Sequence, residues 1–391
     1  MQRRQYNRPA VALRRAPIAF AVLLAAGSPT VVAAPPAATS TAAFDELARA
    51  ADGARAAGRL DEAAGLYRRA LALRPRWAEG LWALGTMAYD EDRWAECRDV
   101  FRRLSVLDPK LAPAWALRGL CEFRLGGFTS ARAHLARGLS LGMAPQEELG
   151  RVALYHQALL LVRDEQFDLA IAPLRTILQF QAASPELDLA CGLVVLRRPL
   201  LPDAVRPSDL DFVREAGKAY CAHLARHPQD AVRRFQVLLA EHPRERYLHY
   251  ACGLALAQQG SADALDQYRK EIELFPDDVL ARVELGFGLL ARGREAEAVA
   301  PGEEAARLAP GLFVTHLLLG RALAATGRLE QGIRELETAA RMQPKIPETQ
   351  LALARAYAQA GRRQDAERAS TAFKTLDASR RGSPGPTPEA P

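Results

Sequence analysis

The chain has 391 residues, too many for one ordinary compact core, and it is 49% hydrophobic but only 7% aromatic. Alanine, leucine and arginine dominate, and all three are good helix formers, so the composition favours an all-helical protein. The net charge of +6 comes mostly from five arginines within residues 1–15, a segment without acids. Because the remainder is nearly neutral, it has no basic excess to neutralise phosphates, and we expect no nucleic-acid partner.

The N-terminus has the pattern of an export signal. Arginines in the first 15 residues precede an apolar run from Ala16 to Gly27, and Val32 and Ala34 occupy the −3 and −1 positions of a cleavage site. Cleavage after Ala33 is equally compatible. We expect residues 1–34 to be a signal peptide and the chain to be periplasmic or secreted, in a bacterium. The alternative is an uncleaved N-terminal anchor in the inner membrane, which would then be the chain's one contact with the membrane.

A period of 34 residues runs through the rest of the chain. It separates Pro75 from Pro109, and it recurs from Pro276 to Pro310 and on to Pro344. A glycine lies 17 residues before several of these prolines, a small residue lies 12 before, and a bulky residue often lies eight before. These positions are Gly58, Gly293 and Gly327; Ala63, Cys97, Ala231, Ala298 and Gly332; and Tyr67, Phe101, Phe235 and Leu336.

Each feature of the period has a physical cause in a pair of packed helices. The glycine permits a tight turn between the two helices, where a Cβ would clash. The small residue lets the second helix approach the first, and the bulky residue fills the gap to the neighbouring pair. Proline cannot continue a helix, so it ends the pair. One pair cannot bury its apolar stripe alone, which is why the pattern repeats.

The pattern resembles the tetratricopeptide repeat family from Phe44 to about Leu376. The resemblance implies an all-α fold, a right-handed superhelical solenoid of about nine antiparallel helix pairs. Two units depart from the pattern: Glu165 stands where a turn glycine is expected, and Ser370 stands where the last unit should have a bulky residue, as in a cap. The pairs are expected to begin near Phe44, Ala78, Ala112, Arg151, Phe212, Arg246, Val279, Phe313 and Pro347.

Residues 185–211 break the repeat. Pro199, Pro202 and Pro207 forbid a continuous helix, although Leu187 to Leu196 can form one helix packed on the array. We interpret this segment as a non-repeat joint between an N-terminal repeat array at 44–184 and a C-terminal array at 212–377. Proline-rich composition predicts a flexible linker at 35–43 and a disordered tail at 378–391.

The sequence contains no catalytic pattern such as HExxH, GxSxG or a P-loop. His223 and His227 lie four residues apart near Cys221, but zinc needs three or four ligands. We therefore expect no enzymatic activity, metal, cofactor or small-molecule substrate. The cysteines are odd in number and widely spaced, so we interpret them as small buried residues at helix contacts, although an exported chain could still oxidise one pair. They are Cys97, Cys121, Cys191, Cys221 and Cys252.

The resemblance also implies a binding surface. In the family, the first helices of successive units line a concave groove that holds peptides or partner segments, at positions two, five, nine, twelve and thirteen of each unit. Aromatic residues and arginine at such positions are typical of binding hot spots. The alternative is that some of the rings only pack between units. The candidates are Trp82, Tyr89, Phe123, Arg124, Tyr155, Arg163, Tyr220, Tyr250, Phe287, Arg321 and Arg355, with His223 beside Tyr220.

One ligand class known in the family is not supported. The clamp for C-terminal carboxylates needs Lys or Arg at the fifth position and Asn at the ninth, whereas the first unit has Ala48 and Asp52. We expect a protein–protein interaction scaffold or adaptor of the bacterial envelope that binds a peptide or partner protein in the groove. Two alternatives stay open: a non-catalytic accessory subunit of an envelope enzyme or secretion complex, and an enzyme with an atypical site near 185–211.

Overall fold

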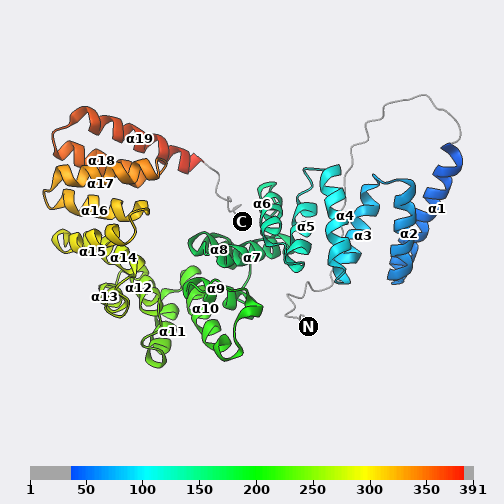
Figure 1. Ribbon diagram of the computed structural model, residues 1–391, viewed down its shortest axis with the longest axis horizontal. Helices are drawn as coiled ribbons and strands as arrows, with labels where there is room; N and C mark the ends of the chain where they lie inside the picture. The colour runs from blue at the N-terminus through cyan, green and yellow to red at the C-terminus, as the bar shows by residue number, and fades with distance from the viewer. Residues whose placement is uncertain (1–36, 383–391) are drawn as a thin grey trace, which may run out of the picture. The chain divides into compact units, whose positions relative to one another are not determined.

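The computed structural model describes residues 37–382 (Figure 1). Over this range the regular structure is nineteen α-helices and two short 3-10 helices, with no strand. No helix in the range is both long and apolar enough to cross a membrane. The predicted signal peptide at 1–34 lies outside the described residues, as do the first residues of the predicted linker and residues 383–391 of the predicted tail.

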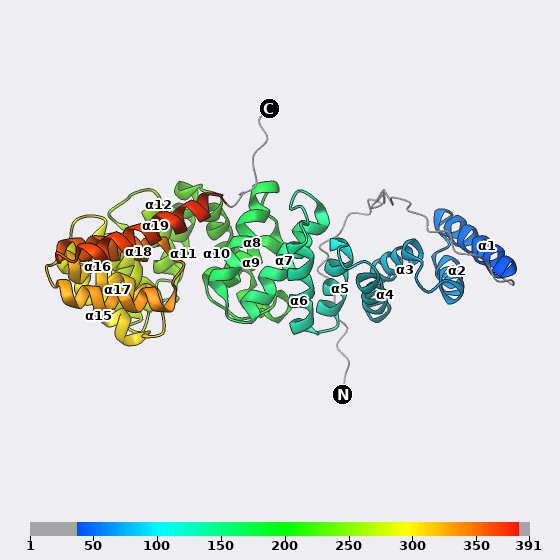
Figure 2. The same cartoon turned by 90° about the horizontal axis from the view of Figure 1, so that it is seen from above.

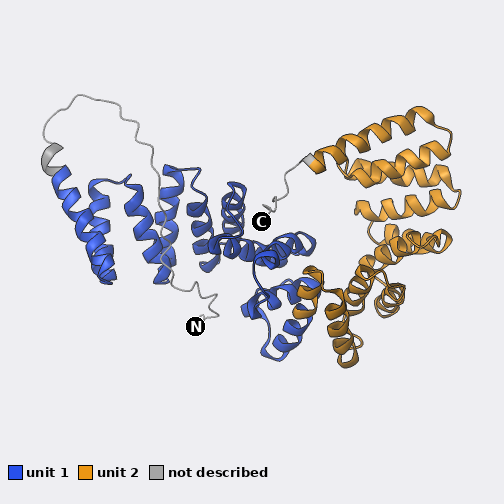
Figure 3. Cartoon of the chain, turned by 180° about the vertical axis from the view of Figure 1, so that it is seen from behind, with its two compact units in different colours: residues 1–217 blue, residues 218–391 orange. Residues whose placement is uncertain are grey.

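The chain divides into two compact units, Met1–Gly217 and Lys218–Pro391 (Figure 3). The boundary falls inside one helix, α10 (Leu210–Leu224). It does not test the predicted limits of the two arrays and the joint, which stay predictions.

Unit 1 is built from consecutive helix pairs followed by a ninth helix (Figures 1 and 2). Its elements before α10 are α1 (Ala37–Ala56), α2 (Leu60–Leu73), α3 (Ala78–Asp90), α4 (Trp94–Leu107), α5 (Ala112–Arg124), α6 (Phe128–Ser140), α7 (Glu148–Arg163), α8 (Phe167–Phe180), α9 (Pro185–Val195) and the 3-10 helices Pro202–Ala204 and Pro207–Asp209.

Unit 2 continues the same arrangement after the last turns of α10. Its further helices are α11 (Pro228–Glu241), α12 (Leu248–Gln258), α13 (Ala264–Leu274), α14 (Val279–Leu290), α15 (Glu295–Leu308), α16 (Phe313–Ala325), α17 (Leu329–Met342), α18 (Pro347–Gln359) and α19 (Arg363–Gly382). The predicted all-α class is confirmed, and helices begin where the repeat alignment placed them at Ala78, Ala112, Val279, Phe313 and Pro347.

Two terminal helices are longer than the repeat pattern predicts. Helix α1 begins at Ala37, inside the predicted linker, and α19 continues to Gly382, inside the predicted tail. The reason at the N-terminus is composition, because the segment before Phe44 is rich in alanine and contains no proline after Pro36. Helix α19 ends next to the proline-rich stretch that starts at Ser383.

The small and bulky positions of the repeat form the core of both units. Ala63, Cys97, Ala231 and Ala298 are 0% exposed, as are the large rings of Tyr67, Phe101 and Phe235. In the α16–α17 pair the approach is close: a Cβ on Gly332 would lie 2.7 Å from the backbone nitrogen of Ala324. The sequence pattern therefore reports a steric requirement, since the second helix packs directly on the backbone of the first.

The turn between paired helices uses a left-handed residue even where glycine is absent. Gly327 has a φ of 84° at this position, and Glu165 and Asp92 take the same conformation with φ of 59° and 58°. A side chain in this region costs on the order of 1 kcal/mol, which the packing of the flanking helices offsets. Glu165 thus preserves the turn that the missing glycine would have made.

Each unit curves toward its first helices. The contacts α3–α5, α5–α7, α12–α14, α14–α16 and α16–α18 join the first helices of neighbouring pairs. Among the described residues of either unit, the second helices of neighbouring pairs do not contact one another to this extent. Because one side of the stack is tighter than the other, we call the side formed by α3, α5 and α7 in unit 1, and by α12, α14, α16 and α18 in unit 2, the first-helix face.

The segment at 185–211 begins with a buried helix. Pro185 starts α9, and the Ser184 hydroxyl caps it by accepting a hydrogen bond from the Leu187 nitrogen at 3.3 Å. Helix α9 packs on α7 and α8, as expected for a helix over 187–196. A Cβ on Gly192 would collide with the backbone of α10, so α9 and α10 pack very closely against each other at this residue. The prolines that follow start the two 3-10 helices.

A disulfide joins two neighbouring pairs of unit 1. Cys97 of α4 and Cys121 of α5 are bonded, with their Cα atoms 6.2 Å apart. Both cysteines are buried at helix contacts, as expected, and their bond is the one oxidised pair that the sequence analysis left open. The two cysteines are 24 residues apart in the sequence, so their spacing does not indicate a bond. They meet because α4 packs directly on α5. The other three, Cys191, Cys221 and Cys252, are free and buried, as the sequence interpretation expects.

The small position at Ala63 can be tested by overpacking. Ala63→Leu should lower the free energy of unfolding by about 1–3 kcal/mol, because Ala63 is 0% exposed between α1 and α2. Ala72→Leu is the matched control, since it makes the same change at an exposed position of the same helix. Urea denaturation measures both. Equal stability of the two variants would contradict the packing role of the small position.

Candidate functional site

The sequence-predicted binding residues all lie on first helices, or on α10. Trp82 and Tyr89 are on α3, Phe123 and Arg124 on α5, and Tyr155 and Arg163 on α7. The remaining candidates are Tyr220 on α10, Tyr250 on α12, Phe287 on α14, Arg321 on α16 and Arg355 on α18. Their exposure separates them: Tyr220 is buried, the other rings are half-buried, and the four arginines are exposed.

The aromatic candidates of unit 1 pack against rings of other helices. Trp82 lies edge-on to Phe101 at a centroid distance of 5.7 Å, and Tyr89 lies edge-on to Trp94 at 5.4 Å. Phe123 contacts Phe128 at 5.6 Å. These geometries are the favourable ones for aromatic pairs. The rings therefore hold neighbouring helices together, and a binding role for them stays a prediction.

Two predicted arginines stack on aromatic rings of the preceding pair. Arg124 lies over Trp94 at 5.1 Å, and Arg163 lies over Phe128 at 4.5 Å. A third arginine, Arg197, repeats the arrangement over Phe167 at 4.9 Å. Each ring belongs to the first residue of a second helix, and each arginine comes from the end of the next first helix or just after it. The result is a row of cation–π contacts along unit 1.

Sequence reasoning missed this row. It placed Arg124 and Arg163 in a binding surface but did not identify Trp94, Phe128 and Phe167 as their partners. A signal was present, because an aromatic residue directly follows the turn in three consecutive units and an arginine follows it 30 to 35 residues later. The period alone pointed to the glycine and the small residue instead.

His156 is a strongly perturbed group on the first-helix face of unit 1. Its ring lies edge-on to Phe123 at 4.8 Å and to Tyr155 at 5.4 Å, and its Nδ1 is 2.8 Å from the carbonyl oxygen of Val152. Burial lowers the pKa of His156 to about 4, with a smaller contribution from the charge of Arg124, while the Val152 hydrogen bond opposes the shift. The imidazole is therefore neutral at physiological pH.

Tyrosines on the same side are also desolvated. Burial raises the pKa of Tyr89 to about 12, although the charge of Arg124 acts in the opposite direction. Burial likewise raises the pKa of Tyr155. Both phenols thus stay protonated, so they offer ring surface and a hydroxyl donor and no nucleophilic phenolate.

The candidate binding residues of unit 2 make two kinds of contact, between two rings and between an arginine and a ring. Tyr220 stacks on His223 at 5.6 Å with the rings nearly parallel, and Tyr250 lies 6.2 Å from Tyr268. Further along, Arg321 lies over the ring of Phe287 at 5.4 Å. Arg355 occupies the same position in its repeat as Arg321 does in the preceding repeat. It lies on α18, which contacts α16.

A buried carboxylate of unit 1 is held by neighbouring bases. Glu122 on α5 lies 2.6 Å from Nδ1 of His134 and 3.3 Å from Nε of Arg118, and Trp115 stacks on the His134 ring at 5.4 Å. Burial acts to raise the pKa of Glu122, but His134 and Arg118 together bring it below its usual value. These groups face one another between α5 and α6 and neutralise each other, which is the arrangement of a packed polar contact.

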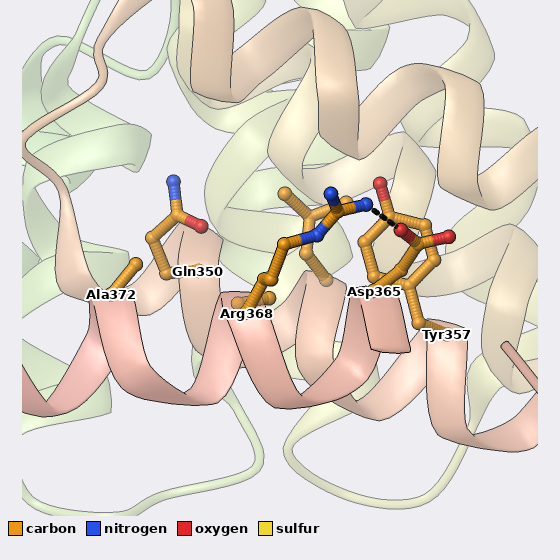
Figure 4. A pocket seen from close by; sticks show the side chains of 7 residues that line it. Gln350, Tyr357, Asp365, Arg368 and Ala372 are labelled. Atoms are coloured by element: carbon orange, nitrogen blue, oxygen red, sulfur yellow. Dashed lines mark hydrogen bonds and ion pairs between the residues drawn. The ribbon is translucent and has the colours of Figure 1, made fainter. Parts of the chain in front are cut away.

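The last helix pair carries a shallow pocket of about 270 Å³ between α18 and α19 (Figure 4). Gln350, Tyr357, Asp365, Arg368 and Ala372 line it, together with Leu353 and Ala369. Its charged groups are paired within the protein, since Asp365 accepts hydrogen bonds from Arg362 and Arg368. The pocket therefore leaves little unsatisfied polarity to select a ligand.

Metal chemistry finds no support among residues 37–382. No group of three or more His, Cys, Asp and Glu side chains in this range is arranged to hold an ion. In the segment near 185–211, Asp209 is paired with Arg206 at 2.8 Å, and this hydrogen bond lowers the pKa of Asp209. A half-buried, paired carboxylate of this kind is typical of a structural contact.

The neutral state of His156 predicts a pH dependence of stability. Its folded pKa of about 4 lies below the unfolded value of 6.5, so between these values the unfolded chain takes up a proton that the folded chain does not. The free energy of unfolding should fall by on the order of 2 kcal/mol as the pH drops from 6.5 to 4. His156→Gln should flatten this part of the profile in denaturant titrations, whereas His227→Gln, at an exposed turn, should not. Identical profiles for both variants would contradict the assignment.

Comparison with a protein family agrees with the helix-pair geometry. A family model described as tetratricopeptide repeat matches residues 48–112, 255–312 and 317–375. No curated protein matches the chain. Among solved structures, the chain is similar to a MamA double mutant (RS-1 ArsTM), with 21% identity over 43% of this chain and 98% of that chain at a TM-score of 0.38.

Two further MamA structures are similar at the same level. MamA from Desulfovibrio magneticus RS-1, from residue 41 to its end, is 22% identical over 44% of this chain and 98% of that chain, with a TM-score of 0.37. Another MamA crystal structure is 16% identical over 42% of this chain and 96% of that chain, with a TM-score of 0.38. The segments matched by the family model form helix pairs in the structure. The chain is therefore a tetratricopeptide repeat-containing protein.

Proposed function

We propose that this protein is a non-catalytic interaction scaffold or adaptor of the bacterial envelope, which binds a peptide or a segment of a partner protein along its first-helix face. Tetratricopeptide repeats generally bind protein partners. The observation that carries the proposal is the contact between first helices of neighbouring pairs within each unit, which the second helices of the described residues do not make to the same extent. It makes the first-helix face the inner, continuous side of each unit.

The composition of that face supports a protein ligand. Exposed arginines stand among half-buried aromatic and aliphatic side chains, which combine directional donors with apolar area. Arginine already stacked on a ring, such as Arg124 on Trp94, loses less conformational freedom when it binds a second group. An extended or helical segment can contact the same repeat position in several units at once.

Two observations support a location outside the cytoplasm. The N-terminal sequence has the basic, apolar and small-residue order of a signal peptide, ending near Ala33 or Ala34. The bond between Cys97 and Cys121 adds an independent argument, because disulfides form and persist in oxidising compartments such as the periplasm.

Site-specific photo-crosslinking tests which face binds the partner. A crosslinking residue replaces Ala325 or Ala358, which are exposed on the first helices α16 and α18. The matched controls are Ala296 and Ala300, which are exposed on the second helix α15. A discrete adduct with a cellular protein should form from the first-helix positions and not from α15. Adducts from α15 alone would place the binding surface on the other side and contradict the proposal.

Export can be checked on protein isolated from cells. We expect a periplasmic or secreted chain whose N-terminus begins after Ala33 or Ala34. Cys97 and Cys121 should resist alkylation under denaturing conditions until a reductant is added, while Cys191, Cys221 and Cys252 react without it and serve as internal controls. An intact Met1 with five reactive thiols would overturn the envelope location.

A further inference from the structure

Most carboxylates on the second helices of unit 2 form an ion pair with a nearby basic side chain. Glu297 is 2.7 Å from Arg294 on α15, and Glu304 is 2.6 Å from Arg307 on the same helix. Such pairs, three residues apart on one helix, leave no net charge to attract a partner. The charges of these two carboxylates are therefore balanced by arginines close to them in the sequence.

The first helices near the end of unit 2 lack this balance. Helix α16 contains no acidic residue. Helix α18 contains one, Glu348, which is engaged by Arg380 of α19 at 2.6 Å. Helix α14 contributes Glu284, whose pKa is raised by burial alone, with no arginine acting on it. No carboxylate on these three helices is thus available to α16 and α18 for charge neutralisation.

Arg321 and Arg355 occupy this unbalanced surface. Both are exposed, both stand at the ninth position of their units, and neither forms an ion pair within residues 37–382. Arg321 lies on α16 and Arg355 lies on α18, at equivalent repeat positions of two helices that contact each other. Partial burial lowers the pKa of Arg321, and the positive charge of Arg355 acts in the same direction. Two neighbouring cations without a counter-ion repel each other, so an anion that bridges them is stabilised.

The surroundings of the pair define the rest of the ligand. The Arg321 guanidinium lies over Phe287, which fixes its plane and leaves its edge donors free for a bidentate bond to a carboxylate. Phe287 itself packs beside Leu290 and Val314, and Ala324 lies one turn beyond Arg321. The two charges therefore stand beside apolar surface, which suits a ligand that alternates acidic and apolar side chains.

We propose that Arg321 and Arg355 form a subsite that binds two carboxylates of an acidic peptide segment in the partner protein. The inference rests on the proposed function and adds the chemistry of the partner. Packed helices lie about 8–10 Å apart and an extended chain rises about 3.3 Å per residue, so the two acidic side chains are two or three residues apart. The subsite uses the ninth position of two consecutive units, which differs from the lysine–asparagine clamp that the sequence lacks.

A peptide array with the mature chain, residues 35–391, tests the subsite. The array presents capped peptides of about twelve residues in which leucine and serine are combined with aspartate, asparagine or lysine at varied spacing. The double variant Arg321→Glu/Arg355→Glu reverses the charge of the subsite. Arg334→Glu is the matched control, because Arg334 is an exposed arginine of α17 without an ion pair in the described range. Thermal unfolding checks each variant, and Arg321→Gln/Arg355→Gln replaces the double variant if charge reversal prevents folding.

We expect the parent and Arg334→Glu to select peptides with two aspartates two or three residues apart. Affinity for these peptides should fall at least about tenfold in either double variant and weaken with added salt, while the charge-reversed variant should prefer the lysine peptides. Selection of leucine-rich peptides regardless of aspartate, unchanged in the variants, would overturn the subsite and leave the proposed function standing. Absence of binding to every peptide would overturn both. Preferential binding of an oligonucleotide competitor, lost in the same variants, would also overturn the subsite.

Discussion

The close approach of two paired helices is the constraint on which the rest of this structure depends. Small residues at one position of the second helices, such as Ala63 and Ala231, are 0% exposed, and the rings of Tyr67 and Phe235, four residues later, are equally buried. Each pair thereby becomes a flat, two-layered element whose remaining apolar surface can be covered only by another pair. Length, curvature and the existence of a first-helix face follow from repetition of this contact.

Repetition also decides what the aromatic residues do. In unit 1, the rings that follow the turns are covered by arginines of the next pair, from Arg124 on Trp94 to Arg197 on Phe167. The aromatic side chains that the sequence pattern assigned to binding, such as Trp82 and Tyr89, pack instead on the second helix of their own pair. The disulfide between Cys97 and Cys121 acts at the same type of junction as the arginines, because it links the second helix of one pair to the first helix of the next.

Charge is distributed according to the same geometry. On the exposed side of the second helices, acids and arginines three residues apart neutralise each other, as Arg294 and Glu297 do. First helices have less exposed surface and few acids, so an arginine placed there keeps its charge unless a neighbouring helix supplies a partner. Arg321 and Arg355 are in this situation, and in the proposed binding role their charge is what would let this face select among partners.

The sequence by itself determined the helix pairs, because a 34-residue spacing of proline, glycine and small residues is a local steric record that survives without knowledge of the fold. It predicted the start of α3, α5, α14, α16 and α18, and it found the helix at α9. Only the tertiary structure decided which residues meet across pairs. The bond between Cys97 and Cys121, the burial of the Tyr220 ring and the stacking of Arg163 on Phe128 depend on where one pair sits on the next. That placement is set by many weak contacts between units, and no single spacing along the chain encodes it.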